Sequence, residues 1–184
     1  VANARILKET PFKEIYVQPA AGDGGGALGA ALYAYHMLLG KPRQFRMEHA
    51  YWGEEHGAGE IEQFLKENQI CYERFEKEGK LIERAVDHLQ AGKVLGWAQG
   101  RFEWGPRALG NRSILADPRR AEMKDVVNTK IKFREPFRPF APSVLAERAG
   151  EYFALQDAPT HYPARFMLYV TDVLLDKRDV IPAI

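Results

Sequence analysis

Arginine recurs three times in residues 101–113, RFEWGPRALGNRS, beside an amide and a hydroxyl. A guanidinium presents paired planar donors that match phosphate or carboxylate oxygens, and it stays charged at any physiological pH. The Trp-Gly-Pro-Arg turn restricts the chain before Arg107, whereas Gly110 frees the backbone after it. These residues predict a phosphate or carboxylate pocket. The alternative is a solvated surface on which the arginines pair with Glu103 and Asp117.

Cations also alternate with apolar residues in a second stretch, residues 128–144, NTKIKFREPFRPFAPSV. On an extended segment, this period of two sends the cations to one face and the apolar side chains to the other. The prolines favour an extended edge over a central strand. Nucleic-acid-binding proteins also interleave basic and aromatic residues, so that alternative stays open. The cations expected on one face are Lys130, Lys132, Arg134 and Arg138.

A glycine-rich turn lies near the start of the chain. Alternation predicts a strand over residues 12–19, and composition predicts a helix over residues 27–39 that ends at Gly40. The free N–H groups at a helix N-terminus attract anions, and glycines let a ligand approach the backbone. Such turns serve packing equally often, so both interpretations remain.

The remaining elements alternate between helix and strand, which predicts an α/β fold. Residues 41–57 look like a connector, and residues 93–99 look like a buried strand. The helix over residues 79–91 is expected to turn Leu81, Ile82, Ala85, Val86 and Leu89 inward. Further helices are predicted over residues 59–70 and 120–131, an extended run over 137–145, and a strand over 164–174.

Charge is unevenly distributed along the 184 residues. The net charge is +1, but residues 101–138 hold ten Lys and Arg against five Asp and Glu, which makes that segment +5 and the rest −4. Local positive charge suits a small anionic ligand and argues against a nucleic-acid partner. The single cysteine, Cys71, excludes an internal disulfide and a cysteine zinc cluster, and it favours the cytoplasm. No apolar run approaches the roughly 18 residues of a membrane span.

The segments GDGGGALGAAL (22–32), GRFEWGPRALGNRSILADPR (100–119) and NTKIKFREPFRPFAPSV (128–144) together resemble the O-carbamoyltransferase family, which includes NodU and the cephalosporin and tobramycin carbamoyltransferases. The resemblance implies a Kae1-like remnant of actin/hexokinase type over residues 1–42, with its last strand, loop and helix. A YrdC-like mixed α/β domain would follow over residues 43–184. The start at Val1 and the absence of an LNTSFN-like segment predict a piece of a longer protein.

Family resemblance also implies a reaction. Carbamoyl phosphate and ATP would form a carbamoyl-adenylate, and the carbamoyl group would pass to a hydroxyl of a sugar, aminoglycoside or cephem. The upstream Kae1-like domain would bind this acceptor, so we expect no transfer by the chain alone. Asp23 resembles the family aspartate that holds a divalent metal, iron or magnesium, with histidines located upstream. A homodimer stays open.

The resemblance assigns roles to individual residues of the two basic stretches. Phe102 and Trp104 either stack on adenine or belong to the core. The implied catalytic residues are Lys132, Arg134 and Arg107. Those implied to bind carbamoyl phosphate or ATP are Arg101, Gly105, Arg107, Asn111, Arg112, Ser113, Asn128, Lys132, Arg134, Arg138 and Ser143.

Two rival functions remain. One is a YrdC-type enzyme of another class, making threonylcarbamoyl-adenylate for tRNA or serving hydrogenase maturation. The zinc-finger segments of hydrogenase maturation factors need several cysteines, and the chain has one. The other is an RNA-binding module, whose affinity would fall steeply with salt.

Overall fold

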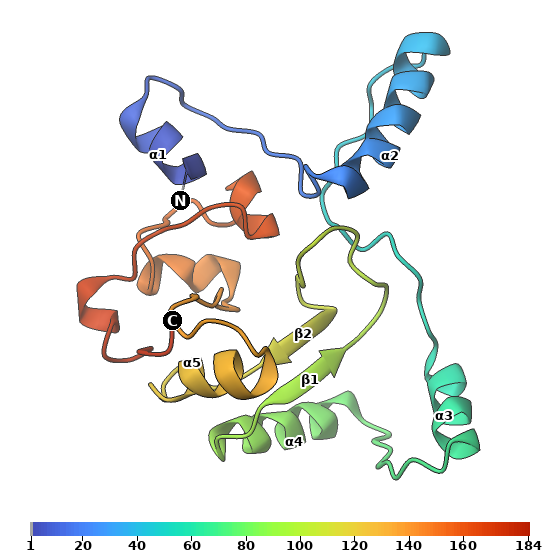
Figure 1. Cartoon of the computed structure of the whole chain (residues 1–184), viewed down its shortest axis with the longest axis vertical. Helices are drawn as coiled ribbons and strands as arrows, with labels where there is room; N and C mark the ends of the chain where they lie inside the picture. The colour runs from blue at the N-terminus through green and yellow to red at the C-terminus, as the bar shows by residue number, and fades with distance from the viewer. Residues whose placement is uncertain (1) are drawn as a thin grey trace.

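A computed structural model describes residues 2–184 and shows a mixed α/β chain, mostly helical, with one two-stranded sheet (Figure 1). Its α-helices are α1 (Ala2–Glu9), α2 (Asp23–Tyr33), α3 (Ala58–Glu67), α4 (Glu78–Gln90) and α5 (Met123–Asp125). Two π-helical turns extend helices, η1 (Ala34–Leu38) after α2 and η2 (Val126–Ile131) after α5. Three 3₁₀ turns follow, η3 (Ala146–Glu151), η4 (Tyr162–Phe166) and η5 (Leu175–Lys177).

The sheet consists of β1 (Leu95–Ala98) and β2 (Arg112–Leu115), which run antiparallel with Ala98 opposite Arg112. The strand predicted over residues 93–99 is therefore confirmed, although its side chains alternate between half-buried and exposed instead of being buried throughout. Strand β2 lies in the segment for which the sequence predicts a turn-rich pocket. Residues 99–111 form the connection between the strands, and this connection contains most of the first arginine stretch.

Three predicted helices are confirmed with shifted ends. Helix α3 corresponds to residues 59–70 and α4 to residues 79–91, while α2 begins four residues before the predicted start at Ala27. Gly92, at φ +79°, follows α4 in the left-handed region that ends many helices. The helix predicted over residues 120–131 is shared between α5 and η2.

The alternating basic face predicted for residues 128–138 is wrong. The helix of α5 continues into η2, where the Lys132 N–H donates to the carbonyl of Val127 at 2.9 Å. Val127 and Asn128 are buried in this turn. Burying this helical side stabilises the turn, so the period-two pattern does not place the cations on one strand face.

Two other predicted strands are also wrong. Residues 12–18 are irregular, because within residues 2–184 no segment forms a strand ladder with them. Tyr16 stacks instead on Tyr162, with ring centroids 5.3 Å apart. Residues 164–174 begin inside η4, which ends at Phe166 and is followed by Met167 in the left-handed region (φ 55°). In this stretch only Val173 forms a β-bridge, with Phe153.

The core connects distant segments of the chain. Met47, Ala50, Tyr162 and Phe166 are buried together, with Leu28, Trp104, Leu109 and Leu168 packed against them. Trp104 therefore packs against the core. The connector, η4, α2 and the β1–β2 connection all contribute to one cluster, which fixes the first arginine stretch in space.

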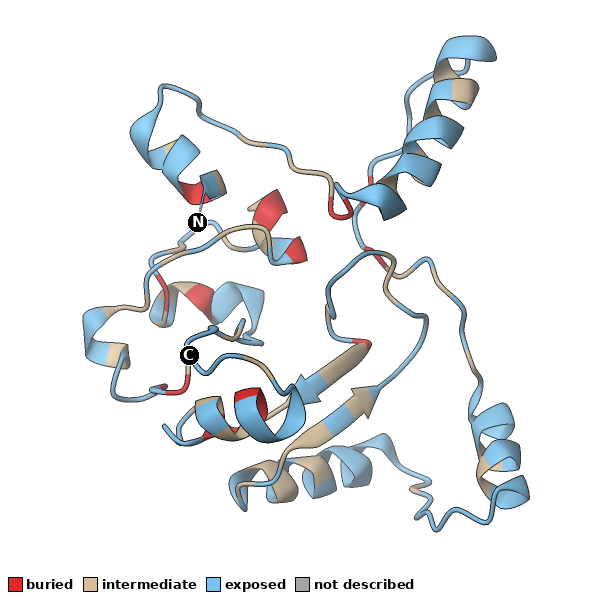
Figure 2. Cartoon of the chain, viewed as in Figure 1, coloured by how far each residue is buried: buried red, intermediate tan, exposed pale blue. Residues whose placement is uncertain are grey.

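Helix α4 leaves much of its apolar face uncovered (Figure 2). The prediction that Leu81, Ile82 and Val86 point inward is wrong, since each is at least 40% exposed, whereas Ala85 and Leu89 are half-buried. None of the helices within residues 2–184 is long and apolar enough to cross a membrane.

Candidate anion-binding site

Glu103 anchors the connection between β1 and β2. Its Oε1 atom accepts backbone N–H groups from Leu109 at 2.8 Å, Asn111 at 2.7 Å and Arg112 at 3.1 Å. Burial raises the pKa of Glu103, but these backbone donors outweigh it and hold the pKa below its ordinary value. The carboxylate therefore closes residues 104–111 into a loop, which we call the Arg107 loop.

Arg112 fastens the base of this loop. Its Nη1 donates to the carbonyls of Gln99 at 2.7 Å and Asn111 at 2.8 Å, and its Nη2 donates to that of Gly100 at 3.1 Å. The guanidinium also lies 3.9 Å from the ring centroid of Phe102, a cation–π contact. In this conformation, Arg112 directs its donors at the chain's own backbone.

Asn111 and Ser113 are likewise engaged within the chain. Asn111 is buried, and its amide donates to the Arg101 carbonyl at 2.8 Å and accepts from Gln99 at 3.3 Å. Ser113 Oγ accepts the N–H of Gly110 at 3.2 Å. The two polar groups thus hold the loop's backbone in place.

Gly105 adopts a backbone conformation that favours glycine, and it lies close to the turn before α2. Its φ of +115° is a conformation that L-residues rarely adopt. An added Cβ would lie 3.4 Å from the Cβ of Ala20, at ordinary van der Waals distance, so the turn before α2 lies close to the Arg107 loop here.

Arg107 differs from its neighbours. It is exposed, and it makes no hydrogen bond or ion pair with any of residues 2–184. Lys132, which follows η2, is also exposed, and its side chain makes no hydrogen bond or ion pair with residues 2–184. Arg107 thus has free donors on a loop whose N–H groups at Leu109, Gly110 and Asn111 are already bonded.

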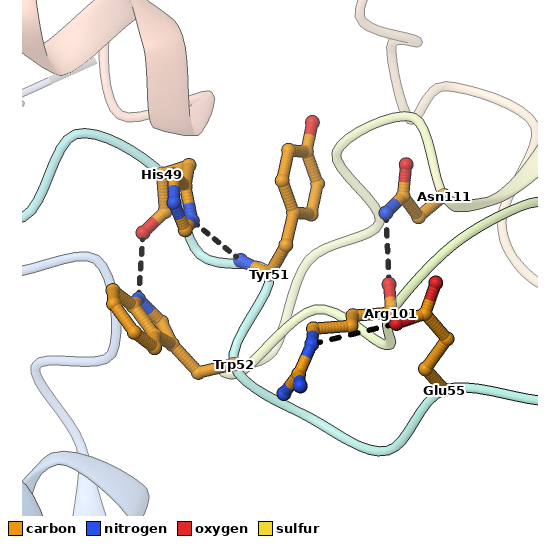
Figure 3. Close-up of a pocket in the computed structure, with 6 residues that line it drawn as sticks. All are labelled: His49, Tyr51, Trp52, Glu55, Arg101 and Asn111. Carbon is orange, nitrogen blue, oxygen red and sulfur yellow. Dashed lines mark hydrogen bonds and ion pairs between the residues drawn. The ribbon is translucent and has the colours of Figure 1, made fainter.

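An open hollow of about 530 Å³ lies beside the loop (Figure 3). Arg101 forms part of its wall, and its Nε lies 3.6 Å from a carboxylate oxygen of Glu55. The His49 ring stacks on Trp52 with centroids 4.9 Å apart. The lining residues are His49, Tyr51, Trp52, Glu55, Arg101 and Asn111.

Four of the six lining residues come from the connector, for which the sequence predicted no site. Its backbone pairs with the start of the first arginine stretch: the Gly53 N–H donates to the Phe102 carbonyl, and the Phe102 N–H donates to that of Glu54, both at 2.9 Å. Tyr51 donates its hydroxyl to the Leu109 carbonyl at 2.7 Å. The aromatic run HAYW followed by glycine is the one feature of the connector's sequence that could have indicated its part in this hollow.

A second group of predicted site residues gathers around Asn128, whose side chain is fully buried at 0% exposure. Its amide donates to the carbonyls of Pro136 at 3.2 Å and Arg138 at 3.0 Å, and its Oδ1 accepts from Arg134 Nε at 2.7 Å. Arg138 pairs with Glu135 at 2.8 Å.

An open hollow of about 560 Å³ lies at this second group, lined by Thr129, Phe133, Arg134, Glu135 and Arg138. The structure thus brings Asn128, Arg134 and Arg138 together, separately from the Arg107 loop. Ser143 is exposed and makes no hydrogen bond to the part of the chain that the structure describes.

Asp23 is the first residue of α2 and is exposed. Among the residues that the structure describes, no group of three His, Cys, Asp or Glu side chains is placed to hold a metal ion. The metal role of Asp23 stays a prediction that depends on residues outside this chain.

Comparison with known proteins covers both ends of the chain. The family model described as "Carbamoyltransferase C-terminus" matches residues 86–184, and that described as "Carbamoyltransferase N-terminus" matches residues 1–32. The chain spans only about a quarter of the length of the curated relatives described next.

Three relatives illustrate the similarity. An uncharacterized protein of Synechocystis is 49% identical over 94% of the chain and 28% of its own length. Nodulation protein NolNO of Sinorhizobium fredii is 45% identical over 99% of the chain and 26% of its length. The 3'-hydroxymethylcephem-O-carbamoyltransferase of Streptomyces clavuligerus is 36% identical over 77% of the chain and 25% of its length.

Proposed function

Because the chain belongs to the carbamoyltransferase family, we propose that it supplies the anion-binding part of an O-carbamoyltransferase that uses carbamoyl phosphate and ATP. The carbamoyl group would pass through carbamoyl-adenylate to a hydroxyl of a small molecule. One of the relatives is named for carbamoyl transfer to a hydroxymethylcephem. In this proposal, an upstream domain binds the acceptor.

The unpaired guanidinium of Arg107 carries the proposal. Arg112 is bonded to backbone carbonyls, and Asn111 and Ser113 serve the loop. Arg107 therefore holds the free charge of this stretch, on a backbone that the rest of the loop fixes. Free donors on a fixed support bind phosphate without a large ordering penalty.

The proposed chemistry requires positive charge more than a nucleophile. Water first cleaves carbamoyl phosphate into carbamate and inorganic phosphate. A carbamate oxygen then attacks the α-phosphorus of ATP, the bond from that phosphorus to the oxygen bridging to the β-phosphate breaks, and pyrophosphate leaves. The two anions repel each other, and cations both bring them together and stabilise the transition state. We assign this role to Arg107 with Lys132 and Arg134, and we assign the metal contact, iron or magnesium, to Asp23.

Calorimetric titration tests the proposal. Carbamoyl phosphate and ATP are titrated separately and together into the chain and into its Arg107→Ala and Lys132→Ala variants. We expect each substitution to weaken binding about ten-fold or more, because a charged hydrogen bond is lost. Arg148→Ala, which removes a surface cation paired with Glu151, serves as the control. Equal affinity of the Arg107→Ala variant and the unaltered chain would contradict the proposal.

A further inference from the structure

One carboxylate accepts most of the backbone N–H groups at the end of the Arg107 loop. The N–H groups of three residues converge on Oε1 of Glu103: Leu109, Asn111 and Arg112. The remaining N–H in this run, that of Gly110, points to the Ser113 hydroxyl. Four successive backbone donors therefore receive a side-chain acceptor from within the chain.

A concave run of N–H groups is a general anion-binding arrangement. Here the anion is Glu103, and an ionised carboxylate accepts such bonds more strongly than a neutral group does. Ligand phosphate consequently finds no free N–H in residues 109–112. Binding falls to the Arg107 side chain, whose position depends on the loop's conformation.

Glycines flank Arg107 on both sides. Gly105 and Gly110 each have φ of +115°, in a region that glycine enters freely. Without an anchor, these two positions give the intervening residues freedom to swing. The anchor that the structure provides is Glu103, since its bonds fall at Leu109, Asn111 and Arg112, on the far side of Arg107.

We propose that Glu103 is a positioning residue that holds the Arg107 loop in the conformation presenting Arg107 to a phosphate-bearing substrate. This inference rests on the proposed function for its ligand, but the ordering of the loop is measurable without one.

The first experiment measures loop order in the absence of ligand. Backbone ¹⁵N relaxation and amide hydrogen exchange are compared in the unaltered chain, Glu103→Ala, Glu103→Gln and the control Glu151→Ala, whose carboxylate pairs with Arg148. In Glu103→Ala we expect residues 105–111 to lose order while β1 and α4 keep theirs. Glu103→Gln retains an acceptor oxygen and is expected to be intermediate. An ordered loop in Glu103→Ala would overturn the inference.

The second experiment links loop order to binding. We expect Glu103→Ala to weaken carbamoyl phosphate binding about ten-fold or more, in parallel with Arg107→Ala, since the guanidinium loses its fixed position. A disordered loop with unchanged affinity would also refute the positioning role. If Arg107→Ala alone leaves affinity unchanged, the proposed function fails at this loop, and the relaxation data then decide separately whether Glu103 orders it.

Chemical rescue distinguishes a positioning carboxylate from general destabilisation. Added acetate should occupy the vacated group of N–H donors in Glu103→Ala, restoring loop order and part of the affinity, with chloride at equal ionic strength as the control. A merely unstable variant would gain nothing specific from acetate. Failure of acetate to restore order would count against the inference.

Discussion

The Arg107 loop and the segment around Asn128 both organise arginines around one polar side chain, but with opposite hydrogen-bonding roles. Glu103 accepts three backbone N–H groups, whereas Asn128 mainly donates, to two backbone carbonyls. The first anchor is charged and half-buried; the second is neutral and fully buried. A charged anchor suits a site that still reaches solvent, while burial of Asn128 requires a neutral group.

These two anchors also leave their arginines in different states. Near Asn128, Arg134 bonds the amide and lies 4.9 Å from the Phe140 ring centroid, and Arg138 pairs with Glu135. In the other region, Arg107 is unpaired. The comparison indicates that the Asn128 segment is built chiefly for rigidity, and the Arg107 loop for presenting a charge.

The largest expected effect is on the Asn128 segment. Replacing Asn128 with Ala removes the partner of two carbonyls and one guanidinium in a buried position. We expect a loss of about 2 to 3 kcal/mol in unfolding free energy, measured by urea denaturation. Thr129→Ala, one residue further on and exposed, is the matched control. A loss below about 1 kcal/mol would show that the buried amide is not the anchor of this segment.

A smaller loss is expected at Arg112. Lysine cannot reproduce the planar fork that reaches the carbonyls of Gln99, Gly100 and Asn111, so Arg112→Lys should lower stability by about 1 to 2 kcal/mol. Arg107→Lys should leave stability unchanged, because Arg107 has no partner to lose. Comparable denaturation midpoints for the two variants would contradict the view that Arg112 holds the backbone of the loop while Arg107 is free to bind a ligand.

Packing of the connector provides the third prediction. A Cβ on Gly53 would lie 2.6 Å from the Cβ of Phe102, so Gly53→Ala must separate the connector from the first arginine stretch. We expect a loss of about 1 kcal/mol and faster amide exchange at Phe102 and Trp104. Gly57→Ala, where an added Cβ meets nothing within 4 Å, is the control. Unchanged exchange at Phe102 would argue against connector pairing.

The smallest expected effect concerns pH and the turn between the two regions. The Arg119 side chain lowers the pKa of the buried Asp117 below its ordinary 3.8, with bonds of 2.8 and 2.6 Å. Because the folded pKa is the lower one, this stabilisation is complete above pH 3.8 and disappears as pH falls through the folded pKa. The midpoint temperature of thermal unfolding, measured between pH 6 and 3, should fall as this stabilisation is lost. Asp117→Asn should remove the part of the pH dependence that comes from Asp117. The effect stays small because Arg119 is largely exposed.

Periodicity predicted the elements that rely on local signals. Helices α3 and α4 and strand β1 follow from their residue patterns, and their positions are confirmed. The alternation in residues 128–138 predicted an extended segment, and this was wrong. Val127 and Asn128 are buried, and the helix continues through them. Strand signals at residues 12–19 failed because pairing depends on a partner edge that a local pattern does not contain.

Arginine content predicted where charge gathers, but not which arginine is free. The roles of Arg107 and Arg112 separate only once their hydrogen bonds are known, since both occur in the same turn-rich stretch. Glu103 was considered only as a surface partner for arginine. Its bonds to N–H groups up to nine residues later could not be predicted from residue type, because they depend on the backbone path of the loop.

Gly105 and Ala20 bring two sequence-distant segments close together. Ala20 is buried in the turn that leads directly into α2, and a Cβ added to Gly105 would be in van der Waals contact with it. Asp23 begins α2 three residues after Ala20, and Arg107 follows Gly105 by two residues. The fold therefore brings the segment of the proposed metal contact and the segment of the proposed phosphate contact near one another.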